Sequence, residues 1–277
     1  MIADVRLFRH RASVGSRATR PVWCFVLGGG GARNGSAALK RALDRASRLT
    51  SPERVVAVVS RDSVMRSSPS LAEMVDVPTI VQPVYRGSAA ELFLPALLVG
   101  RRDPDAVILA LRADDIHDGP VAPCLSRAIG AIARRPDLTL LVGARPRTTR
   151  SEDGFVEPGP PLPGLEDLSL LAVRRFVYDA PRGQGGHDLL VAAALAARAG
   201  TLVALGRRYI PEVLETLEPL ECVADATEAT LLCEAVYECM PYATLSREFL
   251  ERLPDLALLP VPDALREVGD VAACLAS

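Results

Sequence analysis

"VWCFVLGGGGARNGSAALKRALDRASRL", residues 22–49, is the stretch that decides the fold. It joins an apolar run at 22–27 to a segment at 36–49 whose apolar residues recur at helical spacing. This pattern predicts a buried strand, a turn and an amphipathic helix. Four glycines, Gly28 to Gly31, occupy the turn. Such a turn exposes backbone N–H groups at a helix N-terminus, which predicts an anion site, most often for phosphate. A loose turn without a ligand is the alternative.

The next part of the chain repeats the alternation of apolar runs and helical periodicity. Strands are predicted at 55–59, 79–82, 106–111 and 138–144, and helices at 71–75, 88–100 and 120–135. Apolar strands that alternate with helices predict an α/β fold. We expect a Rossmann-like, mixed or mostly parallel sheet with helices on both faces, and ligands beyond the carboxyl ends of its strands.

The pattern changes after residue 144. The segment 145–164 holds five prolines and predicts a surface excursion with an irregular hairpin. Beyond it we expect a strand at 170–178, helices at 188–200, 228–240 and 245–253, and a short strand at 256–261.

Length and composition bound the class of protein. A chain of 277 residues that is 49% hydrophobic can bury a large core, and we expect one domain at 21–277. Residues 1–20 are arginine-rich without an apolar core, which predicts a disordered leader, with a basic contact arm as the alternative. The net charge of −2 argues against nucleic acid or an anionic membrane as partner. No apolar run is long enough to span a bilayer.

The cysteines point to a reducing compartment. All six are scattered without a CxxC pair, which is typical of buried free thiols in a cytoplasmic protein. With only His10, His117 and His187 available, the sequence does not predict a zinc site.

The glycine turn does not match three known glycine-rich motifs. The dinucleotide fingerprint would need glycine where Ala32 stands, and the P-loop would need lysine where Ser36 stands. The stretch 29–34 looks like the oxyanion loop of patatin-like lipases, but no serine here lies on the G-x-S-x-G elbow that those enzymes need.

A longer match covers most of the chain. The segment 27–33, "LGGGGAR", resembles the L-A-G-G-x-G-T-R loop of sugar-1-phosphate nucleotidyltransferases, in particular mannose-1-phosphate guanylyltransferases. In the same order, "VQPVYRGSAAE" (81–91) is similar to the family's E-P-x-x-R-G-T-A-P-A, and "ALRADD" (110–115) to its strand ending in A-D-H. "DGFVEPG" (153–159) resembles its Y-G-x-I-E-P-G hairpin, and "LREVGD" (265–270) its W-S-D-L-G-D. The resemblance spans about residues 21 to 272.

The resemblance implies a reaction and a metal. A sugar-1-phosphate oxygen attacks the α-phosphate of a nucleoside triphosphate, with GTP and mannose-1-phosphate as the implied pair, and pyrophosphate leaves. Mg²⁺ is the implied cofactor, held by Asp114 and, in place of the family's second aspartate, by Glu267. Assembly into a homo- or hetero-oligomer is compatible with the sequence, which does not determine the oligomeric state.

The resemblance also assigns roles to residues. Asp114 and Arg33 are the catalytic pair, Arg33 on the leaving pyrophosphate. Sugar binding falls to Gly154 and Glu157. Nucleotide binding falls to Gly28, Gly29, Gly30, Gly31, Arg33, Gln82, Gly87 and Ser88. On the residues alone, Asp114 also fits a polar loop or a helix cap.

Departures from the family pattern favour a second hypothesis. The family's P-K-Q lysine has no counterpart after the glycine turn, and Tyr178 and Asp179 stand where its F-x-E-K-P motif carries Glu and Lys. Lys40 is the only lysine of the chain and falls inside the predicted first helix. The alternatives are therefore a divergent enzyme and a catalytically inactive homologue that binds nucleotide or a partner.

Overall fold

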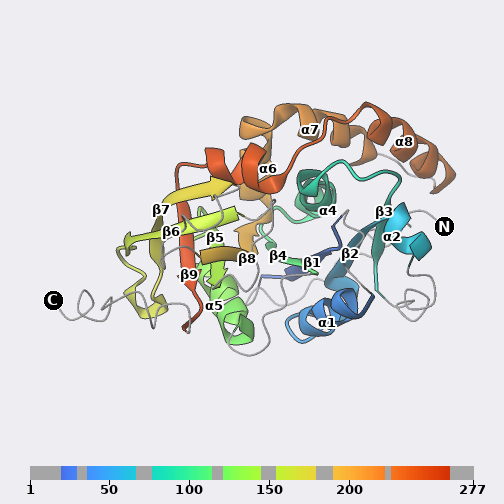
Figure 1. Cartoon of the computed structure of the whole chain (residues 1–277). Coiled ribbons are helices and arrows are strands. Elements are labelled where there is room, and N and C mark those ends of the chain that lie inside the picture. The colour runs from blue at the N-terminus through green and yellow to red at the C-terminus, as the bar shows by residue number, and fades with distance from the viewer. Residues whose placement is uncertain are drawn as a thin grey trace.

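One nine-stranded sheet organises the molecule (Figure 1). The computed structural model describes residues 20–29, 36–66, 77–113, 121–144, 154–178, 190–221 and 226–262. The strands follow one another across the sheet in the order β3-β2-β1-β4-β8-β5-β9-β7-β6. Their bounds are β1 Val22–Leu27, β2 Val55–Ser60, β3 Thr79–Gln82, β4 Val107–Arg112, β5 Thr139–Ala144, β6 Gly154–Pro161, β7 Leu171–Tyr178, β8 Leu190–Arg198 and β9 Leu256–Pro260.

The first half of the sheet is parallel, as the alternating pattern predicts. β1 pairs with β2 on one side and β4 on the other, and β2 pairs with β3, all in parallel. Every residue of β2 is buried, as are the last four of β1. These continuous apolar runs are therefore covered on both faces, which is typical of parallel strands.

The second half is mixed, and here one prediction was wrong. The segment 188–200, expected to be a helix, forms β8 at Leu190–Arg198, and a helix begins only at Ala199. β8 is antiparallel to both β4 and β5. An alanine-rich run has high helix propensity, but pairing with a strand on each side outweighs a propensity of under ~1 kcal/mol per residue.

The remaining strands complete the mixed half. β5 pairs in parallel with β9, and β7 runs antiparallel to β9 and to β6. The expected irregular hairpin includes β6, whose register against β7 shifts at Glu157/Pro158 and again before Pro161. The start of β6 also pairs with the start of β8. Four of the nine pairings are parallel, so this sheet is mixed rather than mostly parallel.

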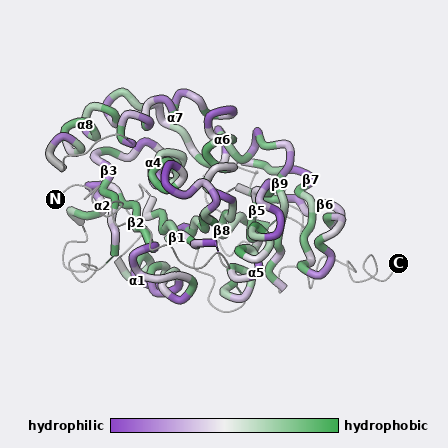
Figure 2. The backbone as a smooth tube through the Cα atoms, turned by 180° about the vertical axis from the view of Figure 1, so that it is seen from behind, coloured by the Kyte–Doolittle hydropathy of each residue, from purple (hydrophilic) through white to green (hydrophobic). Residues whose placement is uncertain are grey.

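Helices cover both faces of the sheet, as expected. Figures 1 and 2 show α1 and α5 on one side and α4, α6, α7 and α8 on the other, and Figure 2 shows hydrophilic and hydrophobic residues alternating along α1. The bounds are α1 Ser36–Ala46, α2 Arg61–Arg66, α4 Ser88–Arg102, α5 Val121–Arg134, α6 Ala199–Tyr209, α7 Pro211–Leu217 and α8 Ala226–Cys239. No helix in the part of the chain that the structure describes is long and apolar enough to cross a bilayer.

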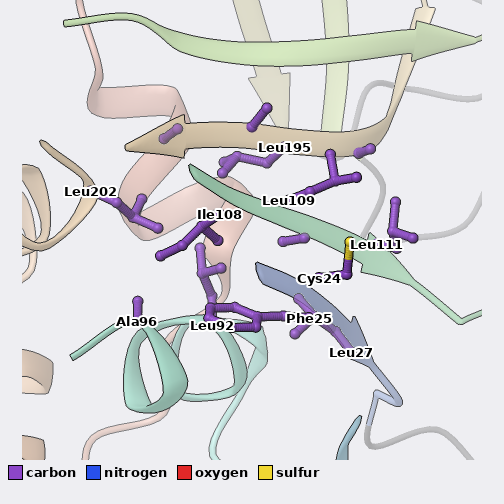
Figure 3. Packing of buried hydrophobic residues seen from close by; sticks show 14 of the residues in the cluster. Cys24, Phe25, Leu27, Leu92, Ala96, Ile108, Leu109, Leu111, Leu195 and Leu202 are labelled. Atoms are coloured by element: carbon purple, nitrogen blue, oxygen red, sulfur yellow. The ribbon is translucent and has the colours of Figure 1, made fainter. Parts of the chain in front are cut away.

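Helix α4 is the most deeply buried of these helices. Residues 89–99 are all buried, although Pro95 lies inside the helix. Figure 3 shows Leu92 of α4 against Phe25 of β1, and Phe93 meets Phe249 edge to face with ring centroids 5.0 Å apart. Each such buried side chain stabilises the fold by about 1.5–3 kcal/mol, so α4 is fixed firmly over β1.

The C-terminal helical pair is only partly as predicted. Helix α8 confirms the expectation at 228–240, but 245–253 forms a π-helical turn, Leu245–Phe249, and a 3-10 turn, Leu250–Arg252. The leader up to residue 19 and the predicted helix at 71–75 lie outside the described residues.

Candidate functional site

The glycine turn begins where the sequence predicts it, directly after β1. The Gly28 N–H donates to the Val58 carbonyl at 2.7 Å, and a Cβ on Gly28 would lie 2.8 Å from that oxygen. Gly29 has a φ of +69°, a left-handed conformation that side chains disfavour. Glycine therefore suits the close approach to β2 at Gly28 and the left-handed backbone at Gly29. Gly30, Gly31 and Arg33 lie outside the described residues.

The end of β4 lies beside the end of β1. Leu27 is opposite Arg112 in the β1–β4 register, and the Ala113 N–H donates to the Leu27 carbonyl at 2.9 Å. Leu27 precedes Gly28, and Ala113 precedes Asp114. Two predicted site segments therefore follow the carboxyl ends of neighbouring strands. Asp114 itself, like Glu267, lies outside the described residues.

Glu91 reaches the glycine turn from α4. Its Oε1 accepts a hydrogen bond from the Gly29 N–H at 2.9 Å, and the residue is only 1% exposed. A buried carboxylate is costly unless it is hydrogen-bonded, and a backbone N–H in the turn satisfies part of that need. The sequence motifs do not point to Glu91, although a single acidic residue in the apolar run "SAAELFLPALL" is a visible signal.

Gln82, at the end of β3, lies in a buried polar contact with α8. Its Nε2 donates to the Tyr237 hydroxyl at 3.0 Å, and both residues are fully buried. Burial, reinforced by the nearby Cys233 and Glu91 side chains, raises the pKa of the Tyr237 hydroxyl despite the Gln82 hydrogen bond. Tyr237 therefore stays neutral and can act as a donor. Among the described residues the Gln82 Oε1 has no hydrogen-bond partner.

Gly87 and Ser88 begin α4 and hold the segment that follows α8. Gly87 has a φ of +91°, and a Cβ there would lie 2.1 Å from the Ala243 carbonyl oxygen. That same oxygen accepts from the Ala89 N–H at 3.1 Å. The Ser88 Oγ accepts from the Leu245 N–H at 2.9 Å.

Arg86 adds hydrogen bonds to this contact between the start of α4 and the end of α8. Its Nε donates to the Tyr237 carbonyl at 2.7 Å and its Nη2 to the Glu238 carbonyl at 3.0 Å. Arginine here satisfies carbonyls near the C-terminal end of α8, where a cation also suits the helix dipole. The predicted nucleotide residues Gln82, Gly87 and Ser88 thus all contact residues 237–245.

The two predicted sugar residues lie on β6 and contact β7. A Cβ on Gly154 would lie 2.1 Å from the Phe176 Cζ, so glycine makes room for that ring. Glu157 pairs with Arg174 at 3.0 Å and with Arg175 at 3.4 Å, its side chain 25% exposed.

The structure therefore brings one group of predicted residues together around the first turn of α4. Gly29 contacts Glu91 of that turn, and Gln82, Gly87 and Ser88 contact the segment from Tyr237 to Leu245. Within the described ranges no three His, Cys, Asp or Glu side chains converge as a metal site.

Comparisons with known proteins support the fold. No family model and no curated protein matches the chain. A crystal structure of mannose-1-phosphate geranyltransferase from Thermus thermophilus aligns with a TM-score of 0.66 and 19% identity, over 87% of this chain and 74% of that one. One of mannose-6-phosphate isomerase from Helicobacter pylori aligns with a TM-score of 0.64 and 12% identity, over 87% and 98%. These similarities confirm the α/β fold with a mixed sheet and helices.

Proposed function

We propose that this protein is a divergent sugar-1-phosphate nucleotidyltransferase that acts in the cytoplasm through one domain at 21–277. Its substrates are a nucleoside triphosphate, in the first place GTP, and a sugar-1-phosphate, in the first place mannose-1-phosphate. The observation that carries the proposal is the β1–β4 pairing, because Leu27, which precedes the glycine turn, and Ala113, which precedes Asp114, are hydrogen-bonded to each other at the carboxyl ends of two adjacent strands. In open α/β sheets, ligands bind beyond the carboxyl ends of the strands.

The reaction is a displacement at phosphorus. An oxygen of the sugar-1-phosphate forms a bond to the α-phosphorus, and the bond from that phosphorus to the bridging oxygen breaks, releasing pyrophosphate. The reacting groups are all anionic, so catalysis is mainly positioning and neutralisation of charge. We assign the phosphate cradle to the glycine turn, Gly28 to Gly31, with the N–H groups of Gly29, Gly30 and Gly31 as its donors, because the Gly28 N–H already donates to the Val58 carbonyl. Arg33 pairs with the departing pyrophosphate.

The other proposed roles follow the same division of the site. Gln82, Gly87 and Ser88 form the nucleotide side, supported by the buried Gln82 Oε1 that no described residue satisfies. Gly154 and Glu157 form the sugar side. Carboxylate donors suit a hard divalent cation, so Asp114 and Glu267 would hold Mg²⁺, which when bound offsets phosphate charge.

A second candidate function is nucleotide binding without turnover. Lys40, the only lysine, is exposed on α1, and Glu157 is already engaged by two arginines. A chain with this site could keep the nucleotide and regulate a partner.

The deciding experiment measures pyrophosphate release with Mg²⁺ for each of the common nucleoside triphosphates against mannose-1-phosphate and glucose-1-phosphate. We expect turnover with at least one pair and a loss of roughly a hundredfold or more in Asp114→Asn, because one electrostatic contact at such a centre is worth about that much. Asp44→Asn, an exposed change on α1, is the matched control and should keep full activity. Folded protein that binds nucleotide but turns over no pair would favour the second function.

A further inference from the structure

The contact between Glu91 and Gly29 places a negative charge where the proposed function needs a phosphate. The Glu91 carboxylate accepts the Gly29 N–H at 2.9 Å, and that N–H carries a single hydrogen. A phosphate oxygen bound to the same N–H would stand within contact distance of the carboxylate. Two anions that share one donor repel each other, and burial strengthens the repulsion because less water screens it.

The fold keeps this carboxylate in place. Glu91 lies in the first turn of α4, and the next residue, Leu92, packs against Phe25 of β1 (Figure 3). Gly87 and Ser88 fix the start of the same helix against Ala243 and Leu245. Withdrawal of Glu91 from Gly29 therefore requires a change of its own rotamer, not a shift of the helix.

We propose that Glu91 is an internal anion that occupies the phosphate position at Gly29 and sets how tightly the glycine turn binds the phosphates of a nucleotide. The inference rests on the proposed function, because it assumes that the turn receives phosphate. An incoming phosphate must displace the carboxylate or bind beside it, so the protein binds phosphates more weakly than the glycine turn alone would allow.

The test compares Glu91→Gln with the unchanged protein by isothermal titration calorimetry, using pyrophosphate and GTP, each with Mg²⁺. Glutamine keeps an oxygen for the Gly29 N–H but removes the charge, so we expect at least tenfold tighter binding of both ligands. Guanosine, which carries no phosphate, should bind equally to both forms. Glu212→Gln removes the same charge from an exposed position on α7 and should change nothing.

The possible outcomes separate the two proposals. Pyrophosphate binding that is equal or weaker in Glu91→Gln overturns the inference and leaves the proposed function standing, since binding is then still measured. No binding of pyrophosphate or GTP by any folded form overturns both. If Glu91→Gln does not fold, as judged by thermal unfolding, Glu91→Met suits the apolar surroundings and frees the N–H, and the same tenfold gain is expected.

Discussion

At the scale of single residues, Gly87 shows how one backbone angle holds the candidate site together. Its φ of +91° and its approach to the Ala243 carbonyl join the start of α4 to the segment after α8. The same junction carries Ser88 and lies one helical turn before Glu91. The geometry of the glycine turn therefore depends on a residue far from it in sequence.

We predict that Gly87→Ala destabilises the protein by about 2 kcal/mol or more, because the left-handed angle strains alanine and the methyl group would overlap the carbonyl. The free energy of unfolding in urea measures the effect. Gly130→Ala is the control: Gly130 is exposed in α5, and a Cβ there meets nothing within 4 Å. It should stabilise the protein by about 0.5–1 kcal/mol. Equal effects of the two changes would contradict the role given to Gly87.

At the scale of elements, the π-helical turn at Leu245–Phe249 owes its start to a reciprocal cap. The Thr244 Oγ1 accepts from the Arg247 N–H at 3.3 Å, and the Thr244 N–H donates to the Glu248 Oε2 at 2.6 Å. The Thr244 hydroxyl also donates to that carboxylate at 2.7 Å. These bonds resemble a capping box, with the acid one residue later than in an ordinary α-helix.

Thr244→Ala should lower the free energy of unfolding by about 1 kcal/mol, the usual cost of losing an N-cap. Thr216→Ala is the matched control, because Thr216 is on α7 and its hydroxyl donates only to the Glu212 carbonyl within its own helix. Urea unfolding of both variants checks the prediction, and a Thr244 effect no larger than that of Thr216 would contradict the cap.

At the scale of the whole molecule, β8 joins the two halves of the sheet. It pairs with β4 of the parallel half and with β5 of the mixed half. Most of its residues are buried, and no other described strand pairs with three neighbours. The N–H groups of β8 are therefore enclosed by strands on both sides.

We predict that amides of 194–198 exchange with deuterium among the slowest in the chain, because their exposure needs global unfolding. β3 pairs with β2 alone, so its amides at 79–82 should exchange faster and serve as the internal comparison. Hydrogen exchange followed by mass spectrometry measures both. Exchange in 194–198 as fast as in 79–82 would show that β8 is not the centre of the sheet.

Several elements and part of the candidate site follow from the sequence alone. Strong local signals, such as the apolar run of β1, its glycines and the periodicity of α1, predict the strand, turn and helix of 22–49. The alternation of apolar strands with helices likewise predicts the α/β fold. The roles assigned to Gly28, Gln82 and Asp114 stay predictions.

Only the tertiary structure decided the conformation of β8 and the partners of the polar residues. The alanine run at 190–198 has no local preference for a strand and becomes one because β4 and β5 pair with it. Glu91 meets Gly29 across 62 residues of sequence, and Gln82 meets Tyr237 across 155. Local patterns encode periodicity and turns, whereas such contacts arise from packing α4 and α8 over the sheet, which no short window of sequence contains.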